Sequence, residues 1–514
     1  MCDQLRADYL SCYGHLKLHT PNIDALAERG VRFENAYCQA PLCGPSRASF
    51  YTGRYMSSHG VMANADKTRL DELTLADYLR PSGYRSALVG RAGNRKDQEL
   101  IQRLGIDPNS ELVQHSQSGG FEPFDQHEGL HPRGIDSQYA DYLKAKGYMS
   151  ENPWQDFVNS GEDKDQNIRP GWRMRNCIYP ARVREADSET AYTTTRAIEF
   201  LEQQEGDQPW CLHLSYIKPH WPYIAPAPYH AMFKAEDVQP AVRDTGEREN
   251  PHPVYQAFMD QEYSESFIRD DVRKKVIPVY MGLIKQLDDH IGRLFEYMND
   301  RDIFDNTMIV LTSDHGDYLG DHWLGEKDLF HEPSVRIPLI IFNPNQTAAE
   351  TRGSVCNALV EAIDLVPTFI EYAGGMICHE RLEGRSLMPL LRSQQASTDW
   401  RKYAISEIDY SDRGPRTQLN QPVYDCRAVM IRGKRWKYIH YNLYPPQLFD
   451  LINDPKELHD LGQDPDHQKV CVDMQRVLID WRRRLKPRTS MPYDNLDGMG
   501  PARDEALGII IGRW

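Results

Sequence analysis

The sequence feature that most restricts the fold is an alternation of helix and strand patterns. Apolar side chains spaced three and four residues apart from Tyr280 to Met298 predict an amphipathic helix, and the apolar run Met308–Leu311 that follows predicts a buried strand. The pattern recurs as a helix at 188–203 with a strand at 210–216, and as a strand at 337–342 with a helix at 362–372. Because strands that alternate with helices form a sheet covered on both faces, we expect a large α/β domain.

The texture of the sequence changes after about residue 390. A polar segment at 392–399 is followed by short strand-like runs at 428–431 and 436–439, and then by a helix at about 470–485. These elements predict a smaller α+β domain with an antiparallel sheet. We therefore divide the chain into a catalytic domain at 1–391 and a second domain at 392–514. The apolar end of the chain, Gly508–Trp514, predicts a subunit contact and hence a homo-oligomer, either a dimer or a tetramer.

Charge and composition exclude several classes of partner. A formal net charge of −15 over 514 residues, with no basic stretch interleaved with aromatic residues, argues against nucleic acid. No apolar run is long enough to cross a membrane. The ten cysteines show no paired spacing, so we expect reduced thiols. Since the first residues, Met1–Arg6, do not have the pattern of a signal peptide, the expected location is the cytoplasm.

Polar clusters directly follow the predicted strands. Lys218, Pro219 and His220 come after the strand at 210–216, and Asp314-His315-Gly316 comes after Met308–Leu311. In α/β sheets, ligands bind at the carboxyl ends of the strands. We therefore expect these clusters to contribute to one site that takes a small anionic substrate.

The segment Pro41–Arg54 contains the pattern Cys-x-Pro-x-Arg at Cys43, Pro45 and Arg47. Pro45 suits the first turn of a helix, which would place Cys43 at a helix N-terminus, where free N–H groups favour an anion. The segment resembles the signature of the sulfatase family, in which this cysteine is oxidised to formylglycine. The resemblance implies an aldehyde nucleophile at residue 43, made by a formylglycine-generating enzyme, with Arg47 as a catalytic cation. The alternative is a buried structural thiol beside a helix cap.

The resemblance also implies a fold and a metal site. The sulfatase family has an alkaline-phosphatase-like sandwich with a large central mixed sheet. Asp3 with Gln4, and Asp314 with His315, match the two places where the family keeps its metal ligands, and Cys43 completes the set. A divalent metal would help the hydrated aldehyde to ionise. Gln4 and His315 resemble the phosphonate monoester hydrolases and choline sulfatases, and an imidazole ligand favours Mn²⁺ over Ca²⁺.

Three more residues match family positions around the transferred anion. His220 resembles the histidine that faces the leaving group, and Lys327 resembles the lysine that contacts the anion. Asn64 corresponds to a polar residue that lines the same pocket. The alternatives are a hydrogen-bonded loop residue for His220 and an exposed charge for Lys327.

Residues 91–93 depart from the family pattern. Arylsulfatases usually have Lys-x-His, two cations that hold the sulfate, where this chain has Arg91, Ala92 and Gly93. Arg91 still supplies substrate-binding charge, and its planar fork suits phosphate. The missing histidine moves the expectation towards phosphonate monoesters and phosphodiesters, with side activity on sulfate monoesters. The alternatives are an aryl or alkyl sulfatase, and a catalytically silent metal-binding oligomer.

Two stretches match the family least well. The segment at about 119–175 is rich in Gly, Asp, Gln and aromatic residues, and we expect it to shape the mouth of the pocket. At the other stretch, only Met1 and Cys2 precede Asp3, whereas the metal-bearing aspartate of this fold normally follows a buried apolar strand. Either the start of the chain is assigned too late or its first strand begins abruptly.

Overall fold

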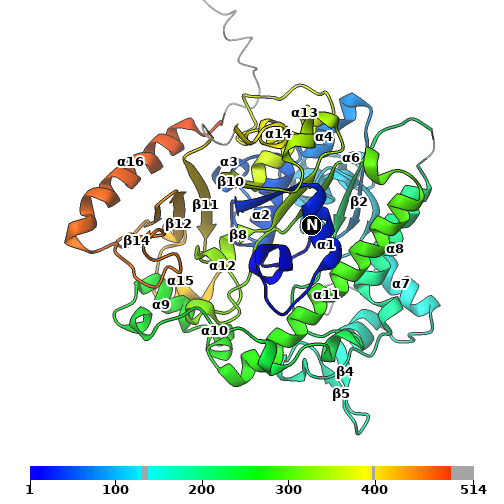
Figure 1. The fold of residues 1–514 in the computed structure, drawn as a ribbon, viewed down its shortest axis with the longest axis horizontal. Helices are drawn as coiled ribbons and strands as arrows, with labels where there is room; N and C mark the ends of the chain where they lie inside the picture. The colour runs from blue at the N-terminus through cyan, green and yellow to red at the C-terminus, as the bar shows by residue number, and fades with distance from the viewer. Residues whose placement is uncertain (96, 129–136, 205, 396–399, 488–514) are drawn as a thin grey trace, which may run out of the picture.

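The computed structural model describes residues 1–95, 97–128, 137–204, 206–395 and 400–487, and its centre is a mixed sheet in two parts (Figure 1). The first part runs in the order β10 (Ser354–Glu361), β1 (Val31–Tyr37), β9 (Leu339–Phe342) and β7 (Ile309–Thr312), with β8 (Arg336–Ile337) also paired to β1. The second part is the parallel set β3 (Glu122–Gln126), β2 (Arg85–Gly90) and β6 (Trp210–Ser215). Cys2 joins the two parts through parallel bridges to Tyr216 and Ser313.

Helices cover both faces of this sheet, as the alternating pattern predicts. One face carries α1 (Pro21–Arg29), α8 (Glu189–Glu202) and α11 (Asp270–Asp300), and the other carries α2 (Cys43–Thr52), α4 (Leu75–Leu79) and α13 (Leu365–Tyr372). Each set has its own apolar core, with Leu283 of α11 in one and Phe50 of α2 in the other. The α/β sandwich with a mixed central sheet is therefore confirmed.

Proline accounts for two differences from the predicted boundaries. The helix predicted from Tyr280 begins earlier, at Asp270. The prediction began too late because Pro278 lies inside α11, and proline usually marks the start of a helix or a break in it. The strand predicted at 337–342 is split at Pro338 into β8 and β9, since proline has no N–H for the ladder.

The C-terminal part contains the predicted antiparallel sheet. Its order is β11 (Tyr403–Asp409), β12 (Arg427–Gly433), β13 (Trp436–Tyr441) and β14 (Gln447–Asp450), and α16 (Gln468–Arg484) packs on one face. Met430, on the other face, belongs to the same apolar core as Phe50. The division at 391/392 stays a prediction, and the predicted contact at 508–514 lies outside the described residues. None of the described helices is long and apolar enough to cross a membrane.

Candidate active site

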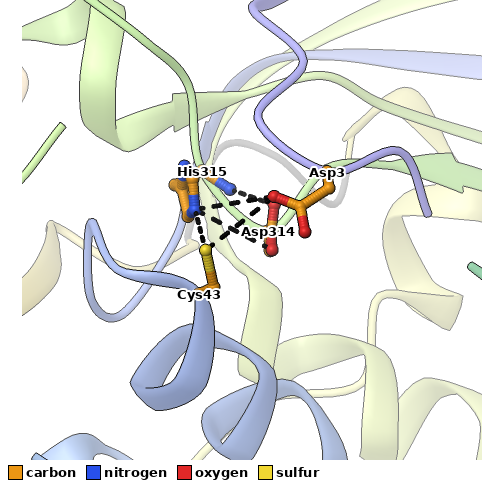
Figure 2. A group of neighbouring side chains, drawn as sticks. All are labelled: Asp3, Cys43, Asp314 and His315. Atoms are coloured by element: carbon orange, nitrogen blue, oxygen red, sulfur yellow. Dashed lines mark hydrogen bonds and ion pairs between the residues drawn. The ribbon is translucent and has the colours of Figure 1, made fainter. Parts of the chain in front are cut away.

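Four buried side chains from three distant segments meet at one point (Figure 2). Asp3 follows the bridge at Cys2, Cys43 begins α2, and Asp314 and His315 follow β7. One donor atom from each lies within 4.8 Å of all the others. The predicted clusters at 3–4 and 314–315 and the predicted nucleophile therefore share one site.

Cys43 occupies the first position of α2, as its proline pattern predicts. Its Sγ lies 3.1 Å from His315 Nε2 and 3.9 Å from Asp3 Oδ1. Burial raises the pKa of the Cys43 thiol above its ordinary value. The N–H of the next residue, Gly44, has no partner within the helix and donates to Asn64 Oδ1 at 2.7 Å, so Asn64 also lies at this end of α2.

Arg47 is fully buried behind the two aspartates. Its Nε donates to Asp314 Oδ2 at 2.9 Å and its Nη2 to Asp3 Oδ2 at 3.1 Å, while Nη1 donates to the carbonyl of Arg91 and to Ser215 Oγ. Burial opposes the charge of Arg47, but the neighbouring groups, Asp314 foremost among them, together outweigh burial and raise the pKa of Arg47. The Arg47 guanidinium thus compensates the charge of the two carboxylates. Its N–H donors are directed at these carboxylates, the Arg91 carbonyl and Ser215, and not at the space beyond Cys43.

Lys327 links His220, the other predicted catalytic group, to the predicted metal ligand Gln4. Its Nζ donates to Gln4 Oε1 at 2.8 Å and lies 3.1 Å from His220 Nε2. The ring of His220 is oriented by its Nδ1, which lies 2.7 Å from the carbonyl of Trp221. Burial lowers the pKa of His220 well below its ordinary value. Lys327 is buried, so it is not the exposed charge of the alternative interpretation.

Arg91 and Gly93 occupy the place where the family pattern departs. Arg91 Nη1 donates to Asp3 Oδ2, and Glu128 Oε2 lies 3.6 Å from Arg91 Nε. Gly93 has a left-handed φ of +66°, and a Cβ there would lie 2.5 Å from Arg47 Cδ. In this chain, Arg47 therefore fills the space that a side chain at 93 would need.

The donor set fits a divalent cation. It combines two buried carboxylates with an imidazole and a sulfur, in a space the size of one ion's coordination sphere. Burial lowers the pKa of His315 to about 3, which keeps its imidazole neutral and able to ligate. Burial would raise the pKa of Asp314, but the surrounding groups, which include the cations Arg47 and Arg91 and the backbone N–H of Gln4, lower it and keep this ligand ionised.

Several supporting residues were not predicted. Asp317 accepts hydrogen bonds from Gln4 Nε2 and, at 2.6 Å, from Tyr223 Oη, so it orients Gln4. Its position three residues after Asp314 was the available signal. Glu128 accepts hydrogen bonds from the backbone N–H groups of residues 92 and 93, and no sequence pattern pointed to it.

Besides Glu128, the segment expected to shape the pocket mouth reaches the site through an aromatic contact. Trp172, from the segment at 119–175, makes an edge contact with Trp221 at 5.7 Å between ring centroids. The indole of Trp221 in turn donates to Glu326 Oε2 at 2.7 Å, and Glu326 precedes Lys327. The segment thus reaches the residues beside His220 and Lys327.

Comparison with known proteins gives matches over nearly the whole chain. Residues 1–376 match the family model "Sulfatase", and residues 320–484 match "N-sulphoglucosamine sulphohydrolase, C-terminal". The multifunctional alkaline phosphatase superfamily protein PehA of Trinickia caryophylli is 32% identical, over 96% of both chains. An arylsulfatase of Clostridium perfringens is 27% identical, over 93% of this chain and 92% of that protein. The phosphonate monoester hydrolase of Silicibacter pomeroyi superposes with a TM-score of 0.82 at 29% identity, over 95% of both chains.

Proposed function

This chain belongs to the sulfatase family and is an ester-bond hydrolase, and we propose that it cleaves phosphonate monoesters and phosphodiesters, with side activity on sulfate monoesters. The observation that supports this choice most is the full-length structural similarity to a phosphonate monoester hydrolase. Tetrahedral oxyanions are recognised by charge and geometry more than by their central atom, which is why activity on more than one ester class is expected.

In this proposal, Cys43 is the precursor of a formylglycine nucleophile, made by a formylglycine-generating enzyme. The hydrated aldehyde supplies a hydroxyl that attacks the ester. Support comes from the surroundings of Cys43, which are the donor atoms of Asp3, Asp314 and His315 and the N-terminus of α2. A purely structural thiol has no need of such neighbours.

Asp3, Gln4, Asp314 and His315, together with residue 43, would hold one divalent ion. Such an ion, Mn²⁺ in preference to Ca²⁺, would lower the pKa of a hydroxyl on residue 43. Arg47 pairs with both carboxylates, and it helps to lower the pKa of Asp314, so Asp314 stays ionised although it is buried. Asp317 holds the amide of Gln4 in place.

His220 and Lys327 form the proton-handling pair. Because Nδ1–H of His220 is directed at the carbonyl of Trp221, its Nε2 is free to accept from Lys327 Nζ. The proton of the pair therefore resides on Lys327, and it is available to the leaving oxygen through either group. Arg91 and Asn64 are the proposed substrate-binding residues, one supplying charge and the other an amide beside Gly44.

The test compares kcat/KM for aryl phosphonate monoesters, phosphodiesters and sulfate monoesters that share one leaving group. We expect the highest value for a phosphorus ester. The second candidate is a sulfuric ester hydrolase, favoured by the similarity to an arylsulfatase, and a sulfate preference would establish it in place of our proposal.

In the same samples, made with a formylglycine-generating enzyme, mass spectrometry of the peptide that contains Cys43 determines whether this residue has been converted to formylglycine. An unmodified thiol without turnover would support the silent metal-binding oligomer instead. The Cys43→Ala protein is the matched control, and it should show neither the modification nor turnover. The cytoplasmic location and the dimeric or tetrameric state stay predictions.

A further inference from the structure

Lys327 lies between two residues whose backbone is in an uncommon conformation. Glu326 has a φ of +60° and Asp328 a φ of +85°. Left-handed backbone is uncommon for residues other than glycine, and it persists where the surrounding structure holds it in place. The contacts of Glu326 and Asp328 therefore determine where the Lys327 side chain starts.

The Glu326 side of this segment is held by groups of the α/β core. Trp221 Nε1 donates to Glu326 Oε2 at 2.7 Å, and the N–H of Tyr318 donates to the carbonyl of Glu326 at 2.6 Å. Both partners follow strands of the central sheet, Trp221 after β6 and Tyr318 after β7. This side of Lys327 is thus fixed by the same segments that bear the site.

The Asp328 side is held by Arg413, which belongs to the C-terminal part. Arg413 Nη2 donates to Asp328 Oδ1 at 2.9 Å, and the Asp328 side chain is buried. The N–H of Asp328 donates to the carbonyl of Pro41 at 3.2 Å, two residues before Cys43. Asp328 therefore connects the arginine to both the lysine and the segment that leads to the nucleophile.

Arg413 is itself fixed to the antiparallel sheet. It lies between β11 and α15 (Gly414–Gln418), and its N–H donates to the carbonyl of Tyr410 at 3.0 Å. The N–H of Tyr410 in turn donates to the carbonyl of Cys426 at 2.9 Å, directly before β12. The place of the Arg413 guanidinium thus depends on how the C-terminal sheet packs against the α/β core.

The charge of Arg413 is already compensated within the structure. Besides the bond to Asp328, Asp412 Oδ1 lies 3.7 Å from Arg413 Nε. Asp328, foremost among the neighbouring groups, raises the pKa of Arg413, so the guanidinium stays charged. A cation that faces two carboxylates has little charge left to attract an anionic ester, which favours a positioning role over substrate contact.

We propose that Arg413 is a positioning residue for Lys327, and that the C-terminal sheet acts on catalysis through it. The pair of Arg413 and Asp328 holds Asp328 in its left-handed conformation and keeps Lys327 at His220. Arg413 acts only through Lys327 and does not touch the substrate. The inference rests on the role of Lys327 in the proposed function.

A double-mutant cycle tests the inference in the full chain. We measure kcat/KM for Arg413→Met, Lys327→Met and the double variant, with the ester that the parent cleaves best. We expect Arg413→Met to lower kcat/KM by about 10–10², because Lys327 is displaced. A positioning residue has no function once the lysine is gone, so the double variant should be no slower than Lys327→Met alone.

The leaving group provides a second readout. Across a series of substituted aryl esters, the loss in Arg413→Met should depend on the leaving group as the loss in Lys327→Met does. The matched control is Arg416→Met, because Arg416 also lies at α15 but donates to the carbonyl of Gln421. This control should have the kcat/KM of the parent.

Two further variants separate positioning from a loss of folding, which urea unfolding measures for every protein. Arg413→Lys keeps a cation for the single bond to Asp328 and should recover most of the activity. Asp328→Asn removes the charge but still suits a left-handed φ, so it should fold and lose as much activity as Arg413→Met. If Arg413→Met does not fold, the cycle with Lys327→Met is made with Asp328→Asn.

An Arg413→Met effect of the same size with and without Lys327 would overturn the inference, since the arginine would then act independently of the lysine. Parent-like activity of Arg413→Met or of Asp328→Asn would overturn it as well. Parent-like activity of Lys327→Met would instead refute the proposed role of Lys327, and the inference with it. A sulfate ester as the best substrate would contradict the proposed function and leave the result of the cycle valid.

Discussion

At the scale of single residues, the site is an arrangement of buried charges that compensate one another. The carboxylates of Asp3 and Asp314 share Arg47, and Arg91 adds a second cation to Asp3. An uncompensated buried charge costs several kcal/mol. The two arginines therefore depend on the carboxylates for compensation, and the carboxylates depend on the arginines. This mutual dependence makes the positions around Arg47 sensitive to changes of a single methyl group.

Gly93→Ala tests this sensitivity. A Cβ at 93 would lie 2.5 Å from Arg47 Cδ, so Arg47 must shift away from Asp3 and Asp314. We expect kcat to fall by at least about tenfold because the charges are misplaced. Gly83→Ala is the matched control, since it shares a left-handed φ, +83°, but has no atom within 4 Å. If both variants lower kcat equally, backbone strain is the cause and the packing explanation is wrong.

Lys327→Met tests the proton-handling pair. Removing the donor to His220 Nε2 leaves the departing oxygen without a proton source, so we expect kcat/KM to fall by about 10²–10⁴. The loss should be larger for poor leaving groups than for good ones, which a series of substituted aryl esters measures. Lys67→Met, at a partly exposed lysine paired with Asp97, is the control. A loss that does not depend on the leaving group would instead assign Lys327 to anion binding.

At the scale of elements, α9 (Pro253–Met259) is attached to the C-terminal part through its cap residue. His252 Nδ1 accepts from the N–H of Val254 at 3.3 Å, and Nε2 lies 2.9 Å from the carbonyl of Pro445. The ring also stacks on Tyr441, with 4.1 Å between centroids. Both nitrogens are used in the neutral form, so a proton on Nδ1 breaks the cap.

Stability should therefore depend on pH through His252. Burial lowers its pKa to about 4, so between roughly pH 6.5 and 4 the unfolded chain binds a proton that the native chain does not. The stability that comes from keeping His252 neutral is present above pH 6.5 and is lost as the pH falls. At pH 5 the free energy of unfolding is lower by about 2 kcal/mol. His252→Asn keeps a capping side chain but does not titrate.

Urea unfolding at pH 7 and pH 5 measures the effect. The His252→Asn protein should lose less stability between these pH values than the parent. His459→Asn, at a histidine whose side chain is 74% exposed, should behave like the parent. Identical pH dependence in all three proteins would show that His252 does not contribute.

At the scale of the whole molecule, buried ion pairs join the C-terminal sheet to the α/β core. Arg401, just before β11, pairs with Glu361 and Asp364 at 2.6 Å each. Arg401→Met leaves two buried carboxylates without their cation, and we expect a loss of about 3–5 kcal/mol in the free energy of unfolding. Arg392→Met, which breaks a partly exposed pair with Glu371, should cost at most about 1 kcal/mol. Similar losses in chemical denaturation would contradict a special role for Arg401.

The sequence alone determined the features that depend on local periodicity. The alternation of helices and strands, the place of Cys43 at a helix N-terminus, and the polar clusters after β6 and β7 all follow from residues close together in the chain. Prolines at 278 and 338 moved the boundaries without changing the pattern. The resemblance to a family added the expectation that Asp3 and Asp314 would meet.

Only the tertiary structure decided which distant groups share charge and space. Arg47 faces two aspartates, Glu128 holds the backbone beside Arg91, and the sheet is divided between β6 and β7. These contacts join positions tens to hundreds of residues apart, and no local pattern encodes their distances. Packing settles them, because a buried charge must find a partner.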